Sequence, residues 1–296
     1  MRCAVIFNPT ARGDKARRFR ALLEQAEGEF ELRPTTGPGT APALAAEAAH
    51  AGCDLIVAAG GDGTVSEVVE GLAAEPDLLE RVTLGVVPLG TINVFARELG
   101  LPADFATAWR VVWKGRTLRV DLPVAHFSRN GRPVSKAFAQ LAGAGLDSRA
   151  IACVSWEIKK RVGPLAYALA GLQALRGPHP PIRARGGDRE AAGPLVLVGN
   201  GRLYGGEVTV QPGASLTDGR LSVRVFRRIG FGMLLRFGLA WLLRRPLPHA
   251  DDVCFQAAEF TLESDQPVPL ELDGDNVGHL PARFTLRPAA LRVRVP

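Results

Sequence analysis

The stretch Asp54-Leu55-Ile56-Val57-Ala58-Ala59-Gly60-Gly61-Asp62-Gly63-Thr64 decides the fold of the first part of the chain. Its first half is an apolar run of strand length, which is typical of a strand buried on both faces. After the glycines, apolar side chains recur at helical spacing, at Val65, Val68, Val69 and Leu72. The glycines are therefore predicted to lie in a strand-to-helix turn.

Thr64 with Glu67 three residues later matches a capping box, so we expect the helix to begin at the end of this turn. The glycines Gly60, Gly61 and Gly63 would let backbone amides approach a ligand, and a helix N-terminus favours phosphate. Asp62 would repel a phosphate unless a cation lies between them or it acts on the proton of an incoming nucleophile. Mg²⁺ with a nucleoside triphosphate resolves this conflict.

The first 90 residues alternate short apolar runs with helical patterns, which predicts a doubly wound parallel α/β domain. The expected strands are 4–7, 30–33, 55–59 and 84–88, and the expected helices are 15–27, 43–50 and 65–72. Each strand is followed by a polar or glycine-containing loop. Because ligands of open α/β sheets bind beyond the carboxyl ends of the strands, these loops should converge on one site.

The fourth of these loops, Pro88-Leu89-Gly90-Thr91-Ile92-Asn93, again turns from a strand into a short helix that stops at Gly100. Gly90 and Thr91 are candidates to contact phosphates or a substrate hydroxyl. For Thr91, a plain helix cap is an equally good interpretation.

After Asp121 the pattern changes to short strand-like runs separated by Gly, Pro, Asn and Asp, which predicts a mostly antiparallel, β-sandwich-like domain. We place the boundary so that the domains are 1–124 and 125–296. The expected strands are 137–141, 195–198, 208–210, 221–226, 260–262 and 283–286, and helices are expected near 155–175 and 230–243. The segment 178–193, rich in Pro, Arg and Gly, is expected to be an exposed loop.

Composition limits the classes of function. The chain has 296 residues, 47% of them apolar, enough for two globular domains, and its net charge of +6 comes from the second half. A basic second half suits an anionic membrane surface or a polyphosphate ligand. Nucleic acid is disfavoured, because aromatic residues make up only 6% and no zinc-finger spacing or aromatic RNA-binding signature occurs.

Cysteine usage and hydropathy indicate a cytoplasmic protein. The cysteines are far apart in sequence, which suggests neither a disulfide framework nor a metal cluster: Cys3, Cys53, Cys153 and Cys254. A strand that starts at Cys3 leaves no room for a signal peptide. The longest apolar helix, 230–243, is interrupted by Arg236 and is shorter than the ~20 residues that span a bilayer.

Several motifs occur together with the glycine turn: Asn8-Pro9, Pro88-Leu89-Gly90-Thr91-x-Asn93-x-Phe95-Ala96-Arg97, Gly143-Ala144-Gly145-Leu146-Asp147, Asp218-Gly219 and Asp273-Gly274-Asp275. With them, nearly the whole chain resembles the diacylglycerol kinase catalytic-domain family, which includes bacterial lipid kinases, sphingosine kinases and ceramide kinases. NAD kinases and phosphofructokinases share the glycine turn. The segment 88–97 separates the chain from NAD kinases.

The resemblance implies an ATP-binding α/β domain and a β-rich lipid-substrate domain with the active site in the cleft between them. The last strand, about 288–296, is a candidate to return to the first domain. ATP would contact Asn8, Pro9, Thr10, Gly13, Thr36, Gly60, Gly61, Gly63, Thr64, Glu67, Gly90, Thr91 and Asn93.

The resemblance also implies the acidic residues of the reaction. Asp62 would help to order the catalytic Mg²⁺, and Asp121 matches an acidic position that follows the first domain in relatives. The Asp-Gly-Glu of the family, whose Glu is the proposed proton acceptor, corresponds to Asp273-Gly274-Asp275. A structural Mg²⁺ would be held by Asp218 with the backbone carbonyls of Ser215 and Arg220.

Three positions depart from the family pattern. Asp275 replaces Glu and shortens the arm of the proposed base by one methylene. Proton abstraction needs contact at ~3 Å or one bridging water, so the second domain must sit closer or a water must intervene. Val94 stands where many members have Asp, and Ser66 where many have Asn. Ordinary structural roles also remain open: a surface strand-end carboxylate for Asp121, and turns for Asp218-Gly219 and for 273–276.

The stretch 227–245 has an apolar body with arginines at both ends and one in its centre. Such a helix suits the surface of an anionic bilayer. A helix packed over the sheet of the second domain, with solvated basic ends, explains the pattern equally well.

These observations favour a cytoplasmic, ATP- and Mg²⁺-dependent lipid kinase, peripheral on the inner face of the membrane, whose substrate is a membrane lipid such as diacylglycerol. A soluble-substrate kinase of the NAD kinase type and a non-catalytic nucleotide-binding membrane protein are the alternatives. A homodimer is a candidate assembly. The identity of the lipid stays open, because the acyl pocket is merely apolar in sequence.

Overall fold

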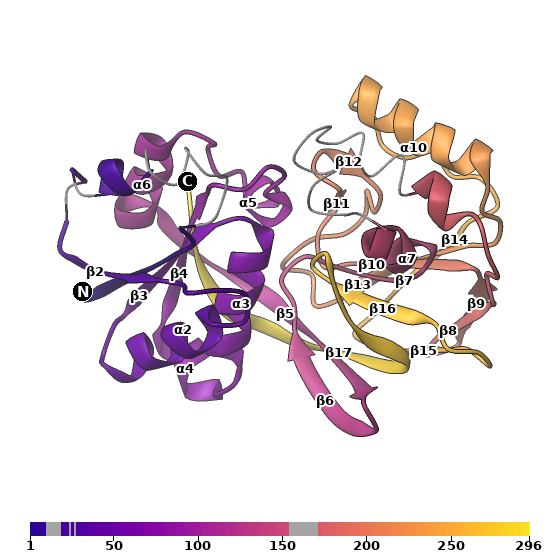
Figure 1. Cartoon of the computed structure of the whole chain (residues 1–296), viewed down its shortest axis with the longest axis horizontal. Helices are drawn as coiled ribbons and strands as arrows, with labels where there is room; N and C mark the ends of the chain where they lie inside the picture. Colours follow the sequence, from indigo (N-terminus) through magenta and orange to yellow (C-terminus); the bar gives the residue numbers. More distant parts are fainter. Residues whose placement is uncertain (10–18, 24, 27, 154–170) are drawn as a thin grey trace. The chain divides into compact units, whose positions relative to one another are not determined.

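The computed structural model describes residues 1–9, 19–23, 25–26, 28–153 and 171–296 (Figure 1). The chain forms two compact units. Unit 1 consists of Met1–Leu122 and Arg287–Pro296, and unit 2 of Pro123–Leu286. The long strand β17 (Asp275–Val295) begins in unit 2 and ends in unit 1.

Unit 1 contains a parallel sheet in the order β17 end, β4, β3, β1, β2. Its strands are β1 (Cys3–Phe7), β2 (Phe30–Pro34), β3 (Leu55–Gly60) and β4 (Thr83–Pro88). They agree with the four predicted runs. All residues of β1 and β3 are buried, as expected for strands covered on both faces.

Helices cover both faces of this sheet, so the doubly wound prediction is confirmed (Figure 1). They are α2 (Ala41–His50), α3 (Asp62–Ala73), α4 (Pro76–Arg81), α5 (Val94–Glu98) and α6 (Phe105–Lys114). Residues 19–23, which are helical, and α6 pack on one face, where Phe19, Phe105 and Trp109 form an aromatic cluster. The rest of the predicted helix 15–27 lies largely outside the described residues.

Unit 2 is built from antiparallel strand pairs, as predicted. One run joins β16 (Pro269–Leu272), β7 (Leu141–Gly145), β10 (Leu195–Gly199), β13 (Leu221–Phe226) and β14 (Val253–Ala257). A second run joins β9 (Arg189–Gly193), β8 (Ile182–Gly186), β15 (Glu259–Glu263) and β17. Side chains of both runs, such as Val196, Val223, Phe260 and Phe284, share one core, which is the arrangement of a sandwich.

Further strands and helices complete the fold. β5 (Arg116–Arg129) passes from unit 1 into unit 2 and pairs with β6 (Arg132–Ala137), and β11 (Leu203–Tyr204) pairs with β12 (Val208–Thr209). Helices α7 (Leu146–Cys153) and α10 (Phe231–Leu243) belong to unit 2, and residues 171–174 are also helical. The bounds of α10 agree with the prediction. Most of the helix expected near 155–175 lies outside the described residues.

Two predictions for unit 2 are wrong. The segment 178–193 is not a loop, because it contains the β8–β9 hairpin. Ile182 and Ala184 alternate inward while the arginines between and after them point outward, and the Arg and Gly content hid this alternation. The predicted strand 137–141 is instead the connection between two strands, since β6 ends at Ala137 and β7 begins at Leu141.

Candidate active site

The loops that follow the four parallel strands of unit 1 lie at one edge of the sheet. The strands end in register, because Phe7 is opposite both Pro34 and Ala59, and Gly60 is opposite Pro88. Backbone hydrogen bonds continue past the strand ends, from Asn8 N to Ala59 O and from Leu89 N to Gly60 O. Asn8, Thr36, the Gly60 turn and the Gly90 turn therefore share this edge.

The capping-box prediction is wrong. α3 begins at Asp62 rather than after Thr64, its N-cap is Gly61, and no side chain caps it. Glu67 instead accepts hydrogen bonds from the backbone amides of Gly39 and Ala41, at 2.8 and 3.2 Å. These amides lie at the start of α2, where unpaired N–H groups and the helix dipole attract a carboxylate.

Close backbone packing joins the two glycine turns. A Cβ atom on Gly90 would lie 2.6 Å from both Gly61 Cα and Asn93 Oδ1, and one on Gly60 would overlap the Thr64 side chain. A Cβ on Gly63 would meet nothing within 4 Å. Gly61 and Gly90 are thus needed to pack the turns together, whereas Gly63 leaves open space in the first turn of α3.

Asn93 closes the second turn. It adopts a left-handed conformation with φ of 53°, its Oδ1 accepts from Gly90 N, and its Nδ2 donates to Gly90 O. Asn93 is also the N-cap residue of α5, so the plain cap interpretation of Thr91 is wrong. Thr91 is exposed at this edge.

Asp62 lies in the first turn of α3, and its Oδ1 accepts a 3.4 Å hydrogen bond from the amide of Phe95 in α5. The carboxylate is thus held between the two turns. Asn8 donates from Nδ2 to Thr64 Oγ1 at 3.4 Å, which brings the end of β1 to the same place. Pro9 and Thr36 lie at this edge, whereas Thr10 and Gly13 are outside the described residues.

The interpretation of Asp121 as a surface carboxylate at a strand end is wrong. Asp121 is 3% exposed, and its Oδ1 accepts a 2.7 Å hydrogen bond from Ala289 N. Ala289 has φ of 49°. Asp121 therefore ties β5 to an irregular point of β17 within unit 1.

The Asp273-Gly274-Asp275 segment forms the tight turn between β16 and β17, as its sequence suggested. The Asp273 carboxylate accepts hydrogen bonds from three consecutive backbone amides, those of Ala139, Gln140 and Leu141. These contacts hold the chain between β6 and β7. Asp275 is exposed, whereas Asp273 is half-buried.

A buried pair of carboxyl groups, Asp147 and Glu271, was missed by sequence reasoning. Asp147 is 6% exposed and accepts a hydrogen bond from the Tyr204 hydroxyl, and Glu271 is fully buried and accepts from Gly274 N at 2.8 Å. Asp147 Oδ2 and Glu271 Oε1 both lie against Gly143, where a Cβ would collide with them. The Gly143-to-Asp147 motif is visible in the sequence, but nothing in the sequence pairs it with Glu271.

Burial raises the pKa of Glu271 well above its ordinary value, and the nearby Asp147 carboxylate adds to the rise. Burial also raises the pKa of Asp147, while its hydrogen bonds with Tyr204 and Glu271 act in the opposite direction. Two adjacent buried carboxylates repel each other, which favours the protonated form of the pair over the doubly ionised form. Glu271 also supports the turn that carries Asp275, because Gly274 N donates to its carboxyl group.

Asp218 lies in an exposed turn with Gly219, whose φ is 71°. Its Oδ1 accepts from Arg220 N, and Gln256 Nε2 is 3.5 Å from its Oδ2. Ser215 is near Thr217 in the same turn. No group of three or more metal-binding side chains occurs in the part of the chain that the structure describes. A cation here would rely on one carboxylate and on backbone carbonyls, which are oxygen ligands of the kind that Mg²⁺ accepts.

Comparison with known proteins covers both units. Residues 2–125 match the family described as diacylglycerol kinase catalytic domain, and residues 140–295 match the YegS C-terminal NAD kinase beta sandwich-like domain. A diacylglycerol kinase of Bacillus subtilis (strain 168) is 32% identical over 96% of this chain and 92% of its own length. The chain belongs to the diacylglycerol kinase catalytic-domain family.

Other members of this family also match this chain over nearly its whole length. A diacylglycerol kinase of Staphylococcus carnosus (strain TM300) is 28% identical over 96% of this chain and 91% of its own. The crystal structure of a diacylglycerol kinase from Bacillus anthracis strain Sterne aligns with a TM-score of 0.72, covering 100% of this chain and 97% of its own, at 23% identity. That likeness shows the shared fold. Membership makes the chain a kinase of the lipid kinase family.

Proposed function

We propose that this member is an ATP- and Mg²⁺-dependent kinase that transfers the γ-phosphoryl group to the hydroxyl of a membrane lipid, most simply diacylglycerol. The observation that carries the proposal is the position of Asp62, which lies in the first turn of α3 between two glycine turns that pack backbone to backbone. The names of the relatives support the choice of acceptor.

The nucleotide would be held at the carboxyl edge of the parallel sheet. The first-turn amides of α3 favour phosphate, and the open space at Gly63 gives a phosphate room to approach. Asn8, Thr36 and Thr91 lie on neighbouring loops of the same edge. Thr64 and Glu67 would act indirectly, because their side chains hold β1 and α2 in place.

The acidic residues divide the remaining tasks. Asp62 fits a cation because its carboxylate faces the same edge as the phosphate-binding amides. Mg²⁺, when bound, would neutralise charge on the phosphate oxygens. Asp275 would accept the proton of the attacking hydroxyl, and Asp273 would keep its turn rigid through three backbone amides. Asp218, with the carbonyls of Ser215 and Arg220, would hold a structural Mg²⁺.

The first test is transfer of labelled γ-phosphate from ATP and Mg²⁺ to a panel of lipids in mixed micelles, with NAD as a lipid-free control. We expect label in one lipid class. Label in NAD would favour the soluble-substrate alternative. Tight ATP binding without any labelled product would favour a non-catalytic protein. Asp275→Glu, which restores the longer side chain of the family, would then test whether the shorter aspartate causes the lack of activity.

The second test concerns Asp62. We expect Asp62→Asn to keep the fold and to lose turnover by ~10²-fold or more, because a preorganised charge at the transferred group is removed. Asp77→Asn is the matched control, since Asp77 is also an acidic residue in the first turn of a helix, α4. A folded Asp62→Asn protein with normal turnover would refute the role given to Asp62.

A further inference from the structure

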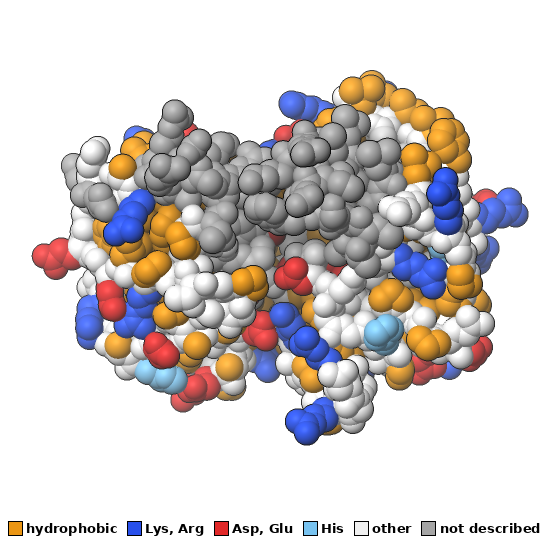
Figure 2. All heavy atoms as spheres, viewed as in Figure 1, with side chains coloured by type: hydrophobic (Ala, Val, Ile, Leu, Met, Phe, Trp, Pro, Cys, Tyr) orange, Lys and Arg blue, Asp and Glu red, His pale blue; other side chains and the backbone are white. Residues whose placement is uncertain are grey.

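The outward face of α10 is apolar over its whole length. Phe231, Leu235, Leu239 and Leu242 follow one another at helical spacing and are 68, 52, 45 and 68% exposed. Trp241 and Leu243 extend this surface, which we call the α10 face. Figure 2 shows it as a continuous apolar ridge along the helix. Most of the exposed large apolar side chains in the described residues belong to it.

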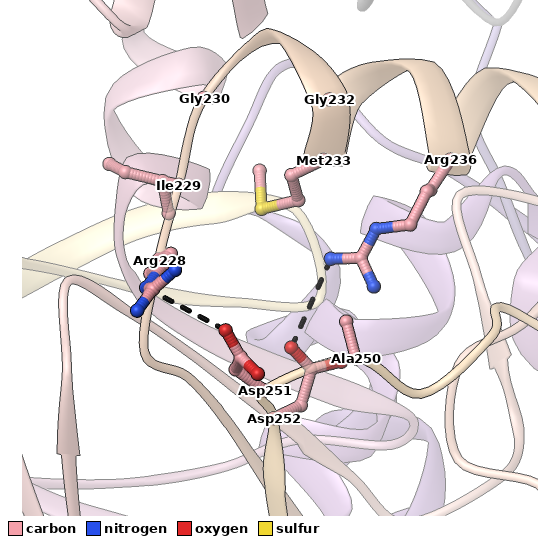
Figure 3. A pocket seen from close by; sticks show the side chains of 9 residues that line it. All are labelled: Arg228, Ile229, Gly230, Gly232, Met233, Arg236, Ala250, Asp251 and Asp252. Atoms are coloured by element: carbon pink, nitrogen blue, oxygen red, sulfur yellow. Dashed lines mark ion pairs between the residues drawn. The ribbon is translucent and has the colours of Figure 1, made fainter.

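The polar contacts of α10 lie on its inner side, whereas an ordinary surface helix turns its charged residues toward solvent. Arg236, the one charged residue inside the helix, turns inward to within 4.0 Å of Asp252 Oδ1 (Figure 3). It also donates to Pro248 O. Asp252 is itself held by the fully buried Arg224 at 2.7 Å. The helix is thus fixed to unit 2 by its inner side, where Met233, Phe237 and Ala240 also pack into an apolar cluster. The side chains of the α10 face point outward.

Positive charge flanks the α10 face at both ends. Arg227 and Arg228 precede the helix, Arg244 and Arg245 follow it, and the stretch 227–245 contains no acidic residue. All four arginines are exposed. Arg228 and Arg244 have carboxylate partners, but Arg227 and Arg245 form no ion pair with any described residue. A partner of the α10 face must therefore accept apolar side chains in its middle and offer negative charge at both ends.

We propose that the α10 face docks this protein on an anionic phospholipid bilayer, with the helix lying in the plane of the membrane surface. The apolar side chains would enter the acyl boundary, Trp241 would sit at the headgroup level, and the terminal arginines would contact lipid phosphates. No described helix is long and apolar enough to cross a membrane. A second copy of this chain is a poorer occupant, because its identical face offers no negative charge to the arginines.

Vesicle binding without ATP tests the proposal separately from catalysis. We expect the wild-type protein to sediment with phosphatidylglycerol vesicles and much less with phosphatidylcholine vesicles. Leu235→Gln/Leu242→Gln should weaken binding at least ~10-fold, since less apolar surface enters the membrane. Arg227→Gln/Arg245→Gln should weaken it by roughly 5-fold per arginine at low salt and reduce its salt dependence.

Matched control variants replace exposed leucine and arginine side chains outside the α10 face. Leu22→Gln replaces an exposed leucine of unit 1, and Arg129→Gln/Arg132→Gln removes two exposed arginines of the β5–β6 hairpin. Both should bind vesicles as the wild type does. Brominated phosphatidylglycerol should quench tryptophan fluorescence in the wild type, and Trp241→Phe should lose most of that quenching while still sedimenting with vesicles.

Two results would overturn the proposal. The first is equal vesicle binding by the α10 and control variants. The second is a wild-type dimer in sedimentation that the leucine variant splits, with vesicle binding unchanged, which would assign the α10 face to a second copy. Turnover of a water-soluble short-chain diacylglycerol, measured on the same variants, reports on the proposed kinase activity alone. A lack of turnover would count against the proposed kinase activity and would not affect the conclusion from vesicle binding.

Discussion

The raised pKa values of Asp147 and Glu271 link the stability of unit 2 to pH. Their raised pKa values mean that the folded protein holds a proton that the unfolded chain releases above about pH 4.5, the ordinary value for Glu. The free energy of unfolding therefore falls as pH rises from about 4.5 through the raised pKa, and this contribution is fully present only below that range. Tyr204 and Asp273 are the other titratable groups close to the pair.

Glu271→Gln should remove much of this pH dependence. The amide stays neutral, still accepts from Gly274 N and can donate to Asp147, so we expect stability at neutral pH to be kept or increased. The measurement is urea unfolding across pH 4.5–8. Glu190→Gln, at an exposed position of β9, is the control and should keep the wild-type slope. An unchanged slope in Glu271→Gln would show that the pair does not retain the proton.

The two glycines of the candidate site should respond differently to a methyl group. Gly90→Ala places a Cβ 2.6 Å from Gly61 Cα, so we expect it to destabilise the fold by about 1–3 kcal/mol, as overpacking does. Gly63→Ala meets no atom within 4 Å and lies in the first turn of α3, so stability should be unchanged or slightly higher.

ATP binding separates these two variants further. If phosphate approaches the backbone at Gly63, Gly63→Ala should weaken ATP binding although the protein is fully folded. Thermal unfolding with and without ATP measures both effects. A Gly63→Ala protein that ATP stabilises as strongly as it stabilises the wild type would place the phosphate elsewhere.

At the scale of elements, one carboxylate connects two helices of unit 1. Glu67 projects from α3 and accepts from the amides of Gly39 and Ala41, so it takes the place of the N-cap side-chain bond that α2 lacks. Thr36, a predicted nucleotide contact, belongs to the loop that this bond anchors, since its amide donates to Thr40 Oγ1. The position of α2 and of the loop before it thus depends on α3.

Glu67→Ala should therefore destabilise the protein by about 1 kcal/mol. This is the lower end of the cost of leaving amide donors without a partner, because the site is partly solvated. Glu67→Gln keeps one acceptor oxygen and should lose less. Urea unfolding measures the free energy. Hydrogen exchange should show faster exchange at Gly39 and Ala41 in Glu67→Ala, and unchanged exchange there would mean that water replaces the carboxylate without loss.

At the scale of the whole molecule, the first unit is completed by the end of the chain. β17 places Arg292 and Val293 beside Thr83 and Leu84 of β4, in parallel, and Leu291, Val293 and Val295 are buried there. The unit thus consists of two segments that are far apart in sequence, 1–122 and 287–296.

Deletion of residues 290–296 should prevent unit 1 from folding stably, because it exposes the β4 edge and removes three buried apolar side chains. Deletion of Pro296 alone, an exposed residue, is the control. Limited proteolysis followed by mass spectrometry should find early cuts within residues 1–122 in the longer deletion only. Cuts confined to unit 2 would contradict the dependence of unit 1 on this strand.

The sequence by itself determined the local elements and their order. The apolar runs predicted β1 to β4, the glycines predicted the turns at their carboxyl ends, and the apolar stretch predicted α10 to within one residue. These features follow from side-chain periodicity and from turn residues, which act over a few positions of the chain. The short polar strand β8 was not predicted, because its inward side chains are few and arginines separate them.

Only the tertiary structure decided which side chains meet. Glu67 leaves its expected cap for amides 26 and 28 residues away, Asp121 binds Ala289 across 168 residues, and Asp147 meets Glu271 in the core of unit 2. The apolar α10 face has the same origin, since only packing shows which side of that helix faces outward. Such partners are selected by burial, which makes an unpaired carboxylate costly, and burial depends on how distant segments pack.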